Sequence, residues 1–264
     1  MSTVNNSGDK PWHPRKNQLF FLLSGFFITN ALLAEFIGVK IFSLEKSVGF
    51  SPLDLNFFGL QHASLNLTAG VLLWPFVFVL TDLINEYYGI RAVRRFSWFA
   101  VTLIIYAFLL VSLAIALVPA GFWPASQAAN GVPDMQLAYV AVFGQGRWII
   151  LGSVVAFLLG QLLDVWVFHW VKQKTGEGGI WIRATGSTLV SQFLDSFVVL
   201  FIAFYWGADW PLSTVLGIGL INYAYKFLVA LGLTPLIYLA HNRIERYLGP
   251  ALADEMRREA MQGG

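Results

Sequence analysis

Apolar residues occur along the chain in long runs that are separated by shorter polar segments. A helix needs about 20 consecutive apolar residues to cross the hydrocarbon core of a bilayer. Six runs reach this length. The pattern predicts an all-α, polytopic membrane protein, a single domain over residues 1–264, with six transmembrane helices at 19–42, 69–88, 97–118, 148–171, 182–205 and 212–240.

The composition supports this class of protein. Hydrophobic residues make up 57% of the chain and charged residues 12%, whereas a soluble domain carries about 25% charged residues. The mean hydropathy is +0.64. These values exclude a soluble enzyme, a disordered chain and a nucleic-acid-binding domain. The chain has no cysteine and four scattered histidines, so we predict no disulfide, metal site or cofactor.

Lysine and arginine residues are distributed unevenly between the two sides of the six predicted helices. Thirteen of the 17 lie on the side of the N-terminus, three lie on the opposite side, and Lys226 lies within the last helix. Cytoplasmic segments of membrane proteins carry the excess of basic residues. The distribution therefore predicts an N-in, C-in topology with cytoplasmic tails at 1–17 and 242–264.

Three connecting segments have recognisable patterns. The segment 43–68 contains several apolar residues and is predicted to lie on the membrane surface, while 119–147 is rich in proline and small residues and is predicted to form an irregular cap. Acidic and basic residues alternate at helical spacing over 242–262. This last pattern predicts a single solvated cytoplasmic helix.

Ionisable and amide side chains interrupt the apolar runs, where each charge costs about 2.5–3.5 kcal/mol on insertion. Several pairs are three or four residues apart, a spacing that places both members on one helix face. Their depths are similar, so we predict one polar cavity near the bilayer centre. The substrate-binding candidates are Asp82, Asn85, Glu86, Gln161, Asp164, Gln192, Asp195, Asn222 and Lys226.

Some of these residues also permit a purely structural interpretation. Asp195 and Lys226 are suited to a neutralising salt bridge, and the glutamines to hydrogen bonds between helices. Glu35 lies five positions from Asn30, so it faces elsewhere and is expected near the outer interface. A short pattern occurs twice, as Gln161-x-x-Asp164 and Gln192-x-x-Asp195, in two adjacent predicted helices of opposite direction.

Motifs of several enzyme classes are missing from the sequence. There is no G-x-x-x-x-G-K-[ST] loop for ATP hydrolysis, no H-E-x-x-H pair and no G-x-S-x-G nucleophile turn. We therefore predict a protein that is not an enzyme and has no catalytic residue. From the residues alone, the prediction is a carrier or binding component for a small polar molecule.

Residues 75–89 read P-x-x-F-x-x-T-D-x-x-N-E-x-Y-G and are followed by Arg91 and Arg94. Two further blocks accompany this motif: QLLD at 161–164 with WIR at 181–183 and TGST at 185–188, and SQFLDS at 191–196 with NYAYK at 222–226 and TP at 234–235. Over about residues 30–237 the chain resembles the queuosine precursor transporters of the vitamin-uptake-transporter-like family.

This resemblance implies import of 7-cyano-7-deazaguanine, its 7-aminomethyl relative or a related base or nucleoside for salvage of the tRNA nucleoside queuosine. It also implies a multi-pass protein of the bacterial inner membrane. Its expected partners are this small substrate and the lipid bilayer, with a homo-oligomer left open and no nucleic acid. A carboxylate can accept two hydrogen bonds from the donor edge of a guanine-like ring, and Asp195 is the first candidate for that role.

Two alternatives remain at this level. One is the substrate-binding component of an ATPase-coupled vitamin importer, and the other, which no motif supports, is an intramembrane enzyme. The energy source is also open, since either a proton carried on a buried aspartate or facilitated diffusion with metabolic trapping is compatible with the residues.

Overall fold

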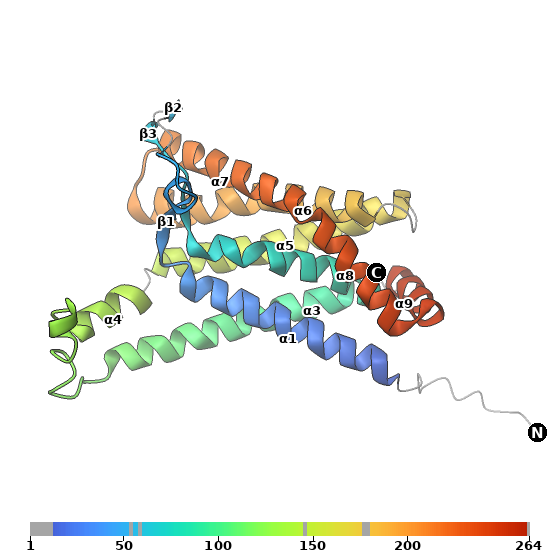
Figure 1. Cartoon of the computed structure of the whole chain (residues 1–264), viewed down its shortest axis with the longest axis horizontal. Helices are drawn as coiled ribbons and strands as arrows, with labels where there is room; N and C mark the ends of the chain where they lie inside the picture. Colours follow the sequence, from blue (N-terminus) through green and yellow to red (C-terminus); the bar gives the residue numbers. More distant parts are fainter. Residues whose placement is uncertain (1–12, 53–54, 58–59, 145–146, 176–179, 263–264) are drawn as a thin grey trace, which may run out of the picture.

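The computed structural model describes residues 13–262 with gaps at 53–54, 58–59, 145–146 and 176–179, and the chain is mostly helical (Figure 1). The helices are α1 (Pro14–Ile37), α2 (Leu44–Ser47), α3 (Trp74–Ala116), α4 (Met135–Phe143), α5 (Arg147–Thr175), α6 (Ile180–Leu200), α7 (Leu212–Gly232), α8 (Thr234–Leu248) and α9 (Pro250–Gln262). Short helical turns are η1 (Ala69–Leu72), η2 (Ala128–Asn130) and the π-helical η3 (Phe201–Trp206), which continues α6.

Five helices of the described residues are long and apolar enough to cross a membrane, one fewer than the sequence predicts. They cover Pro14–Ile37, Trp74–Ala116, Met135–Thr175, Thr185–Trp206 and Leu212–Gly232. The difference lies in α3, whose 43 residues contain most of both stretches predicted at 69–88 and 97–118. No loop separates these two stretches, because the residues between them are helical apart from Gly89.

Helix α3 reverses its direction at Gly89. This residue has φ 78° and ψ 175°, far from helical values. Near one end of α1, the ring of Phe20 packs against both Tyr88 and Phe96, with centroid distances of 5.0 and 4.9 Å. Both flanks of Gly89 therefore contact the same residue of α1.

The far ends of the two halves of α3 meet the other end of α1. A Cβ on Gly70, shortly before α3, would lie 2.8 Å from the carbonyl oxygen of Ala34. Phe108, late in α3, packs against Phe36 with a centroid distance of 5.6 Å. The first half of α3 is thus antiparallel to α1 and the second half is parallel to it, as the two arms of α3 in Figure 1 show.

Helix α1 begins and ends earlier than predicted, since residues 38–42 lie beyond its end. The next residues form β1 (Ile41–Ser43), which pairs antiparallel with β4 (Asn66–Thr68), and β2 (Leu55–Phe57) pairs with β3 (Leu60–Ala63). The segment 43–68 therefore contains two small two-stranded sheets. The described residues of the predicted cap at 119–147 are irregular except for η2, α4 and the first residue of α5.

The helix predicted at 212–240 is wrong over its last eight residues. It ends at Gly232, and α8 starts at Thr234 with Pro235 in its first turn. Proline has no backbone N–H and its ring clashes with the carbonyl four residues earlier, so it ends the preceding helix and is tolerated at the start of the next. The apolar run predicted as one helix is therefore divided between α7 and α8.

The predicted solvated helix at 242–262 is also wrong. The segment forms the end of α8 and all of α9, which are separated by Gly249 at φ 82°. Helix α9 buries Ala253, Met256 and Ala260. These apolar residues recur at intervals of three and four positions, so one face of α9 packs against the protein while the charged face remains outside.

Helices α5 and α6 are antiparallel neighbours. A Cβ on Gly160 of α5 would lie 3.7 Å from the Cβ of Asp195 of α6. Two turns earlier on α5, a Cβ on Gly152 would lie 3.3 Å from the Cβ of Ile202, which is later in the chain, just beyond α6. The small glycines allow this close approach, and it brings the two Q-x-x-D units opposite each other.

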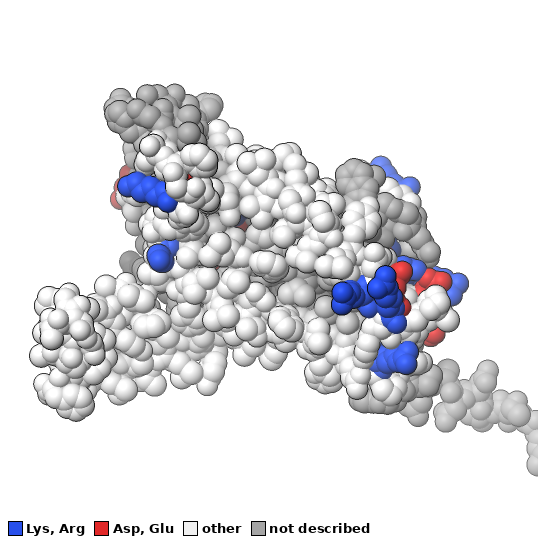
Figure 2. Space-filling model, viewed as in Figure 1, with Lys and Arg blue, Asp and Glu red and all other residues white. Residues whose placement is uncertain are grey.

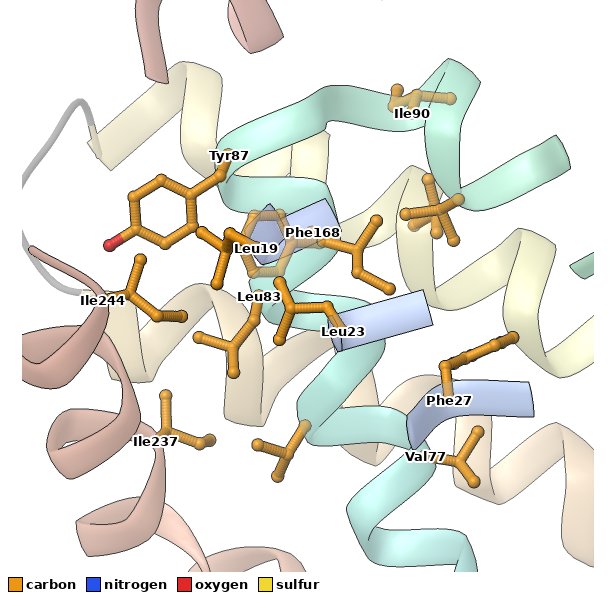
Figure 3. Packing of buried hydrophobic residues seen from close by; sticks show 14 of the residues in the cluster. Leu19, Leu23, Phe27, Val77, Leu83, Tyr87, Ile90, Phe168, Ile237 and Ile244 are labelled. Atoms are coloured by element: carbon orange, nitrogen blue, oxygen red, sulfur yellow. The ribbon is translucent and has the colours of Figure 1, made fainter. Parts of the chain in front are cut away.

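A hydrophobic cluster joins α1, α3, α5 and α8 (Figure 3). In Figure 3, Leu83 of α3 lies between Leu23 of α1 on one side and Ile237 and Ile244 of α8 on the other. This cluster lies on the apolar face of the first arm of α3. The opposite face of the same arm carries the polar residues described next.

Candidate functional site

The first arm of α3 carries Asp82, Asn85 and Glu86 on one face, because residues three and four apart lie on the same side of a helix. All three are buried; Asp82 is 2% exposed and Glu86 is fully inaccessible. Leu83 and Tyr87 lie on the opposite, apolar face. Burial of three polar side chains on one face requires partners from other helices.

Helix α5 contacts this arm of α3 at Thr81, next to Asp82. The Thr81 hydroxyl lies 2.8 Å from Oε1 of Gln161, a fully buried amide of α5, and 2.9 Å from the carbonyl oxygen of Val77. Donation from Thr81 assigns Oε1 as the acceptor, which leaves the Nε2 group of Gln161 as a donor. Thr81 was not singled out from the sequence, although it directly precedes Asp82.

Helix α6 lines the same region with hydroxyl groups. Ser191 Oγ donates to Oδ1 of Asp164 at 3.2 Å. Ser187 and Thr188 lie beside both Asp82 and Asp164, and the two carboxyl groups are near enough to interact electrostatically. These hydroxyls were also missed as site residues from the sequence, although their intervals of three and four residues place them on one helix face.

Many polar atoms of this region lack a hydrogen-bond partner of good geometry among the described residues. Native structures leave few buried polar atoms without a partner, and each such atom requires an explanation. Here the atoms come from α3, α5 and α6, and they include both donors and acceptors. They are both carboxylate oxygens of Asp82, both amide atoms of Asn85, Nε2 of Gln161, Oδ2 of Asp164 and Oε1 of Gln192.

A pocket at the interface between α3, α6, α7 and α8, called the cavity below, reaches this region. Small-molecule sites are typically mostly apolar, with a few polar groups that fix the orientation of the ligand. The cavity has this character. Its lining residues are Val71, Trp74, Pro75, Phe78, Val79, Asp82, Thr185, Thr188, Gln192, Lys226, Ala230, Leu233 and Ile237.

Three of the predicted site residues, Asp82, Gln192 and Lys226, therefore line the cavity. Gln161 and Asp164 are fully buried behind it, joined to it through Thr81 and the hydroxyls of α6. Asn85 is one turn from Asp82. Asn222 is half-buried on α7 and is not among the lining residues of the described chain.

Asp195 lies at the edge of the region in an ion pair. Lys226 Nζ is 2.5 Å from Oδ2 of Asp195, and the side chains are 13% and 20% exposed. This contact supports the interpretation of Asp195 and Lys226 as a structural salt bridge. Asp82, which faces the cavity with both oxygens free of hydrogen bonds from the described residues, replaces Asp195 as the first candidate for ligand recognition.

Glu86 is also held by an ion pair. Lys172 Nζ of α5 lies 3.0 Å from Oε2 of Glu86, and both side chains are buried. From the sequence, Lys172 was counted among the basic residues of a cytoplasmic loop. Glu35 is buried as well and accepts a hydrogen bond of 2.5 Å from Ser153 of α5, which links α1 to α5.

Among the aromatic residues near the polar region, Trp74 lines the cavity and packs against Phe157 with a centroid distance of 5.3 Å. It is positioned to cover the face of a flat ligand. Among the described residues there is no group of three or more His, Asp or Glu side chains that could hold a metal ion. The arrangement of an aromatic ring beside carboxylate and amide groups is suited to a small, flat molecule with hydrogen-bonding edges.

Comparison with known proteins places this chain in a family. Residues 68–240, which include the cavity and the carboxylate cluster, match the family described as "Putative vitamin uptake transporter". No solved structure matches the chain.

Three curated proteins are similar to the chain. A "Probable queuosine precursor transporter" of Bacillus subtilis (strain 168) is 29% identical over 231 residues, which are 86% of this chain and 94% of the relative. A "Queuosine precursor transporter" of Escherichia coli (strain K12) is 31% identical over 62% of this chain and 67% of its own length. A Haemophilus influenzae protein, also named a probable queuosine precursor transporter, is 29% identical over 64% of this chain and 65% of its own length.

These matches confirm the family resemblance carried by the motif at residues 75–89. The relatives are named as transporters, and several helices of the described chain are apolar enough to span a membrane. The protein is therefore a multi-pass membrane protein. By sequence match over residues 68–240, the chain belongs to the vitamin uptake transporter family.

Proposed function

We propose that this protein imports a queuosine precursor of the deazaguanine type, such as 7-cyano-7-deazaguanine, across the bacterial inner membrane. The observation that carries this proposal is the cluster of buried carboxylate and amide groups beside a mostly apolar cavity. The names of the relatives supply the substrate class, and the geometry is compatible with it.

The proposed topology has six crossings with both termini in the cytoplasm. Each arm of α3 counts as one crossing because the helix reverses at Gly89. Basic residues support the orientation: Figure 2 shows Lys and Arg concentrated at the end of the molecule that holds α8 and α9, with fewer at the opposite end. An excess of basic residues is typical of the cytoplasmic side.

In the proposed complex, the ligand ring lies in the cavity with its hydrogen-bonding edge toward α3. A deazaguanine edge presents a carbonyl acceptor next to two N–H donor groups. The ionised carboxylate of Asp82 accepts from both donor groups in a charge-assisted, bidentate contact. Gln192, the amide that lines the cavity, is the donor suited to the carbonyl. Trp74 covers the ring face.

The experiment is uptake of labelled 7-cyano-7-deazaguanine into cells that cannot synthesise it and lack their own transporter. Expression of this protein is expected to restore label in tRNA queuosine at trace external concentrations. Equal labelling in cells that carry an empty vector and in cells that express the protein would contradict the proposal.

Competition tests the recognition of the ligand edge. Buried acceptors are left unpaired by an analogue that lacks the matching donors, and such analogues are rejected strongly. Hypoxanthine lacks the exocyclic amine, so it is expected to compete poorly with the labelled deazaguanine, and adenine is expected to compete still less. If the three compounds compete equally, Asp82 does not recognise the donor edge.

A further inference from the structure

We propose that the carboxyl groups of Asp82 and Asp164 form a proton-binding pair, and that one proton enters the cell on this pair with each substrate molecule. The inference deepens the proposed import function and rests on it. It assigns an energy source, which neither the sequence nor the names of the relatives provide.

Two buried carboxyl groups lie close together in this pair. Asp82 of α3 is 2% exposed and Asp164 of α5 is fully inaccessible. Both lie beside the hydroxyls of Ser187 and Thr188 on α6, and they interact electrostatically with each other. Two carboxylates that share one buried site do not both remain ionised, because like charges disfavour each other at short range.

The two nearby lysines form ion pairs with other carboxylates. On α5, Lys172 is bound to Glu86, the carboxylate one turn from Asp82 on α3. On α7, Lys226 lines the cavity but is bound to Asp195 of α6. Among the described residues, no lysine, arginine or histidine forms an ion pair with Asp82 or Asp164. A proton taken up from water is therefore the positive charge that can neutralise one carboxylate of the pair.

Several polar atoms around the pair are left without partners. Both oxygens of Asp82, Oδ2 of Asp164 and Nε2 of Gln161 are buried and lack a hydrogen bond from the described residues. Gln161 is one turn from Asp164 on the same face of α5. The pair therefore belongs to the polar site beside the cavity, together with the amide of Gln161.

These groups explain why proton and substrate bind together. The donor edge of the substrate requires an ionised acceptor, and Asp82 reaches the cavity. In the empty site Asp164 accepts a hydrogen bond from Ser191, which favours its ionised form, so the proton rests on Asp82. Once the substrate donates two hydrogen bonds to Asp82, Asp82 is the ionised member and the proton passes to Asp164, which lies behind it. The proton enters from the outside, stays on Asp164 while the site is closed to water, and leaves to the cytoplasm when hydration stabilises both carboxylates. Substrate binding thereby favours the state that carries one proton.

The test uses the purified full-length chain in liposomes, with the membrane voltage clamped to zero and the outside more acidic by about one pH unit. For one proton per substrate, labelled 7-cyano-7-deazaguanine is expected to accumulate about tenfold inside. A protonophore is expected to reduce this ratio to one. A pH dye inside the liposomes is expected to report about one proton for each substrate that enters.

Two variants test whether Asp164 is required for proton-driven accumulation. Asp164→Asn imitates the protonated acid permanently and is expected to equilibrate the substrate without accumulating it, whatever the pH difference. Asp209→Asn makes the same chemical change at an exposed position before α7 and is expected to accumulate substrate like the wild type. If Asp164→Asn does not assemble, the dye measurement on the wild type decides the question.

The possible failures are distinguishable. If the wild type equilibrates the substrate but neither accumulates it nor moves protons, the proton pair is overturned while the import function stands. If Asp164→Asn accumulates substrate like the wild type, the assignment to Asp164 is overturned. If no substrate enters above protein-free liposomes, the proposed function fails, and the inference fails with it.

Discussion

At the scale of single residues, polar groups within the apolar helices fall into two kinds. One kind is satisfied by a charged partner, as in the Glu86–Lys172 pair. The other kind, represented by Asp82, is buried with carboxylate oxygens that lack hydrogen bonds from the described residues. The first kind is expected to stabilise the bundle and the second kind to serve the ligand, so substitutions at the two should differ in their effects.

Asp82→Asn removes the charge and replaces one acceptor oxygen with a donor group. A hydrogen bond to a charged group contributes about 1.5–3 kcal/mol, so uptake of labelled 7-cyano-7-deazaguanine is expected to fall about 10- to 100-fold. The amount of protein in the membrane is expected to stay close to that of the wild type. Asp209→Asn is the control, and near-normal uptake by Asp82→Asn would remove Asp82 from the binding site.

Glu86→Gln leaves the ammonium group of Lys172 buried without its charged partner. Loss of one member of a buried pair costs about 3–5 kcal/mol, so a clear decrease in thermal stability in detergent is expected. Lys172→Met in the same chain is expected to restore most of the loss.

The matched control for that substitution is Glu259→Gln. It breaks the pair between Lys16 and Glu259, whose side chains are 30% and 33% exposed. An exposed pair contributes at most about 1 kcal/mol. Equal losses in Glu86→Gln and Glu259→Gln would show that the buried pair does not stabilise the fold.

At the scale of the elements, the reversal of α3 depends on Gly89. Its φ of 78° is unfavourable for residues with a Cβ, and a Cβ at this position would lie 2.9 Å from the carbonyl oxygen of Ala260 in α9. The family motif ends at this glycine, after the T-D-x-x-N-E segment. The same short stretch therefore provides the polar face, the turn and the contact surface for α9.

Gly89→Ala is expected to lower stability by more than about 1 kcal/mol, because the left-handed conformation alone costs about 1–2 kcal/mol with a side chain. The contact with Ala260 adds to this, so α9 is expected to become more sensitive to proteolysis. Gly25→Ala is the control, since Gly25 lies in α1 and a Cβ added there would meet no atom within 4 Å. If both variants melt alike, the turn tolerates a side chain.

At the scale of the whole molecule, the proposed N-in, C-in topology can be tested with single cysteines, because the chain has none of its own. Cysteines at Ser126 and Ala208, which are exposed, are expected to react with an impermeant reagent applied from outside. A cysteine at Lys174, also exposed, is expected to react only after the membrane is opened. Gly263, which the sequence also predicts to be cytoplasmic, lies outside the described residues.

Labelling of Lys174 from outside in intact cells would contradict the six-crossing topology. Labelling at all three positions only after the membrane is opened would contradict it as well. The reagent therefore tests both the reversal of α3 as a pair of crossings and the orientation of the bundle.

Much of this architecture follows from the sequence by itself. Apolar runs of membrane-spanning length require helices, because backbone polar groups in a bilayer must be satisfied within the segment. Because burying charges is costly, the polar residues were expected to lie together in one site. Asp82, Gln192 and Lys226 do line one cavity. These results depend on local composition and on the helical repeat, both of which are visible in a single chain.

The tertiary structure decided which polar residues pair with each other and which face the cavity. The sequence offers Asp82, Asp164 and Asp195 as buried acids and favours Asp195 for the ligand; packing gives Asp195 a lysine and leaves Asp82 beside the cavity. It also placed Lys172 next to Glu86 and docked α9 at the turn of α3. Such choices depend on the rotation and approach of helices far apart in the sequence, which helical periodicity within one segment does not specify.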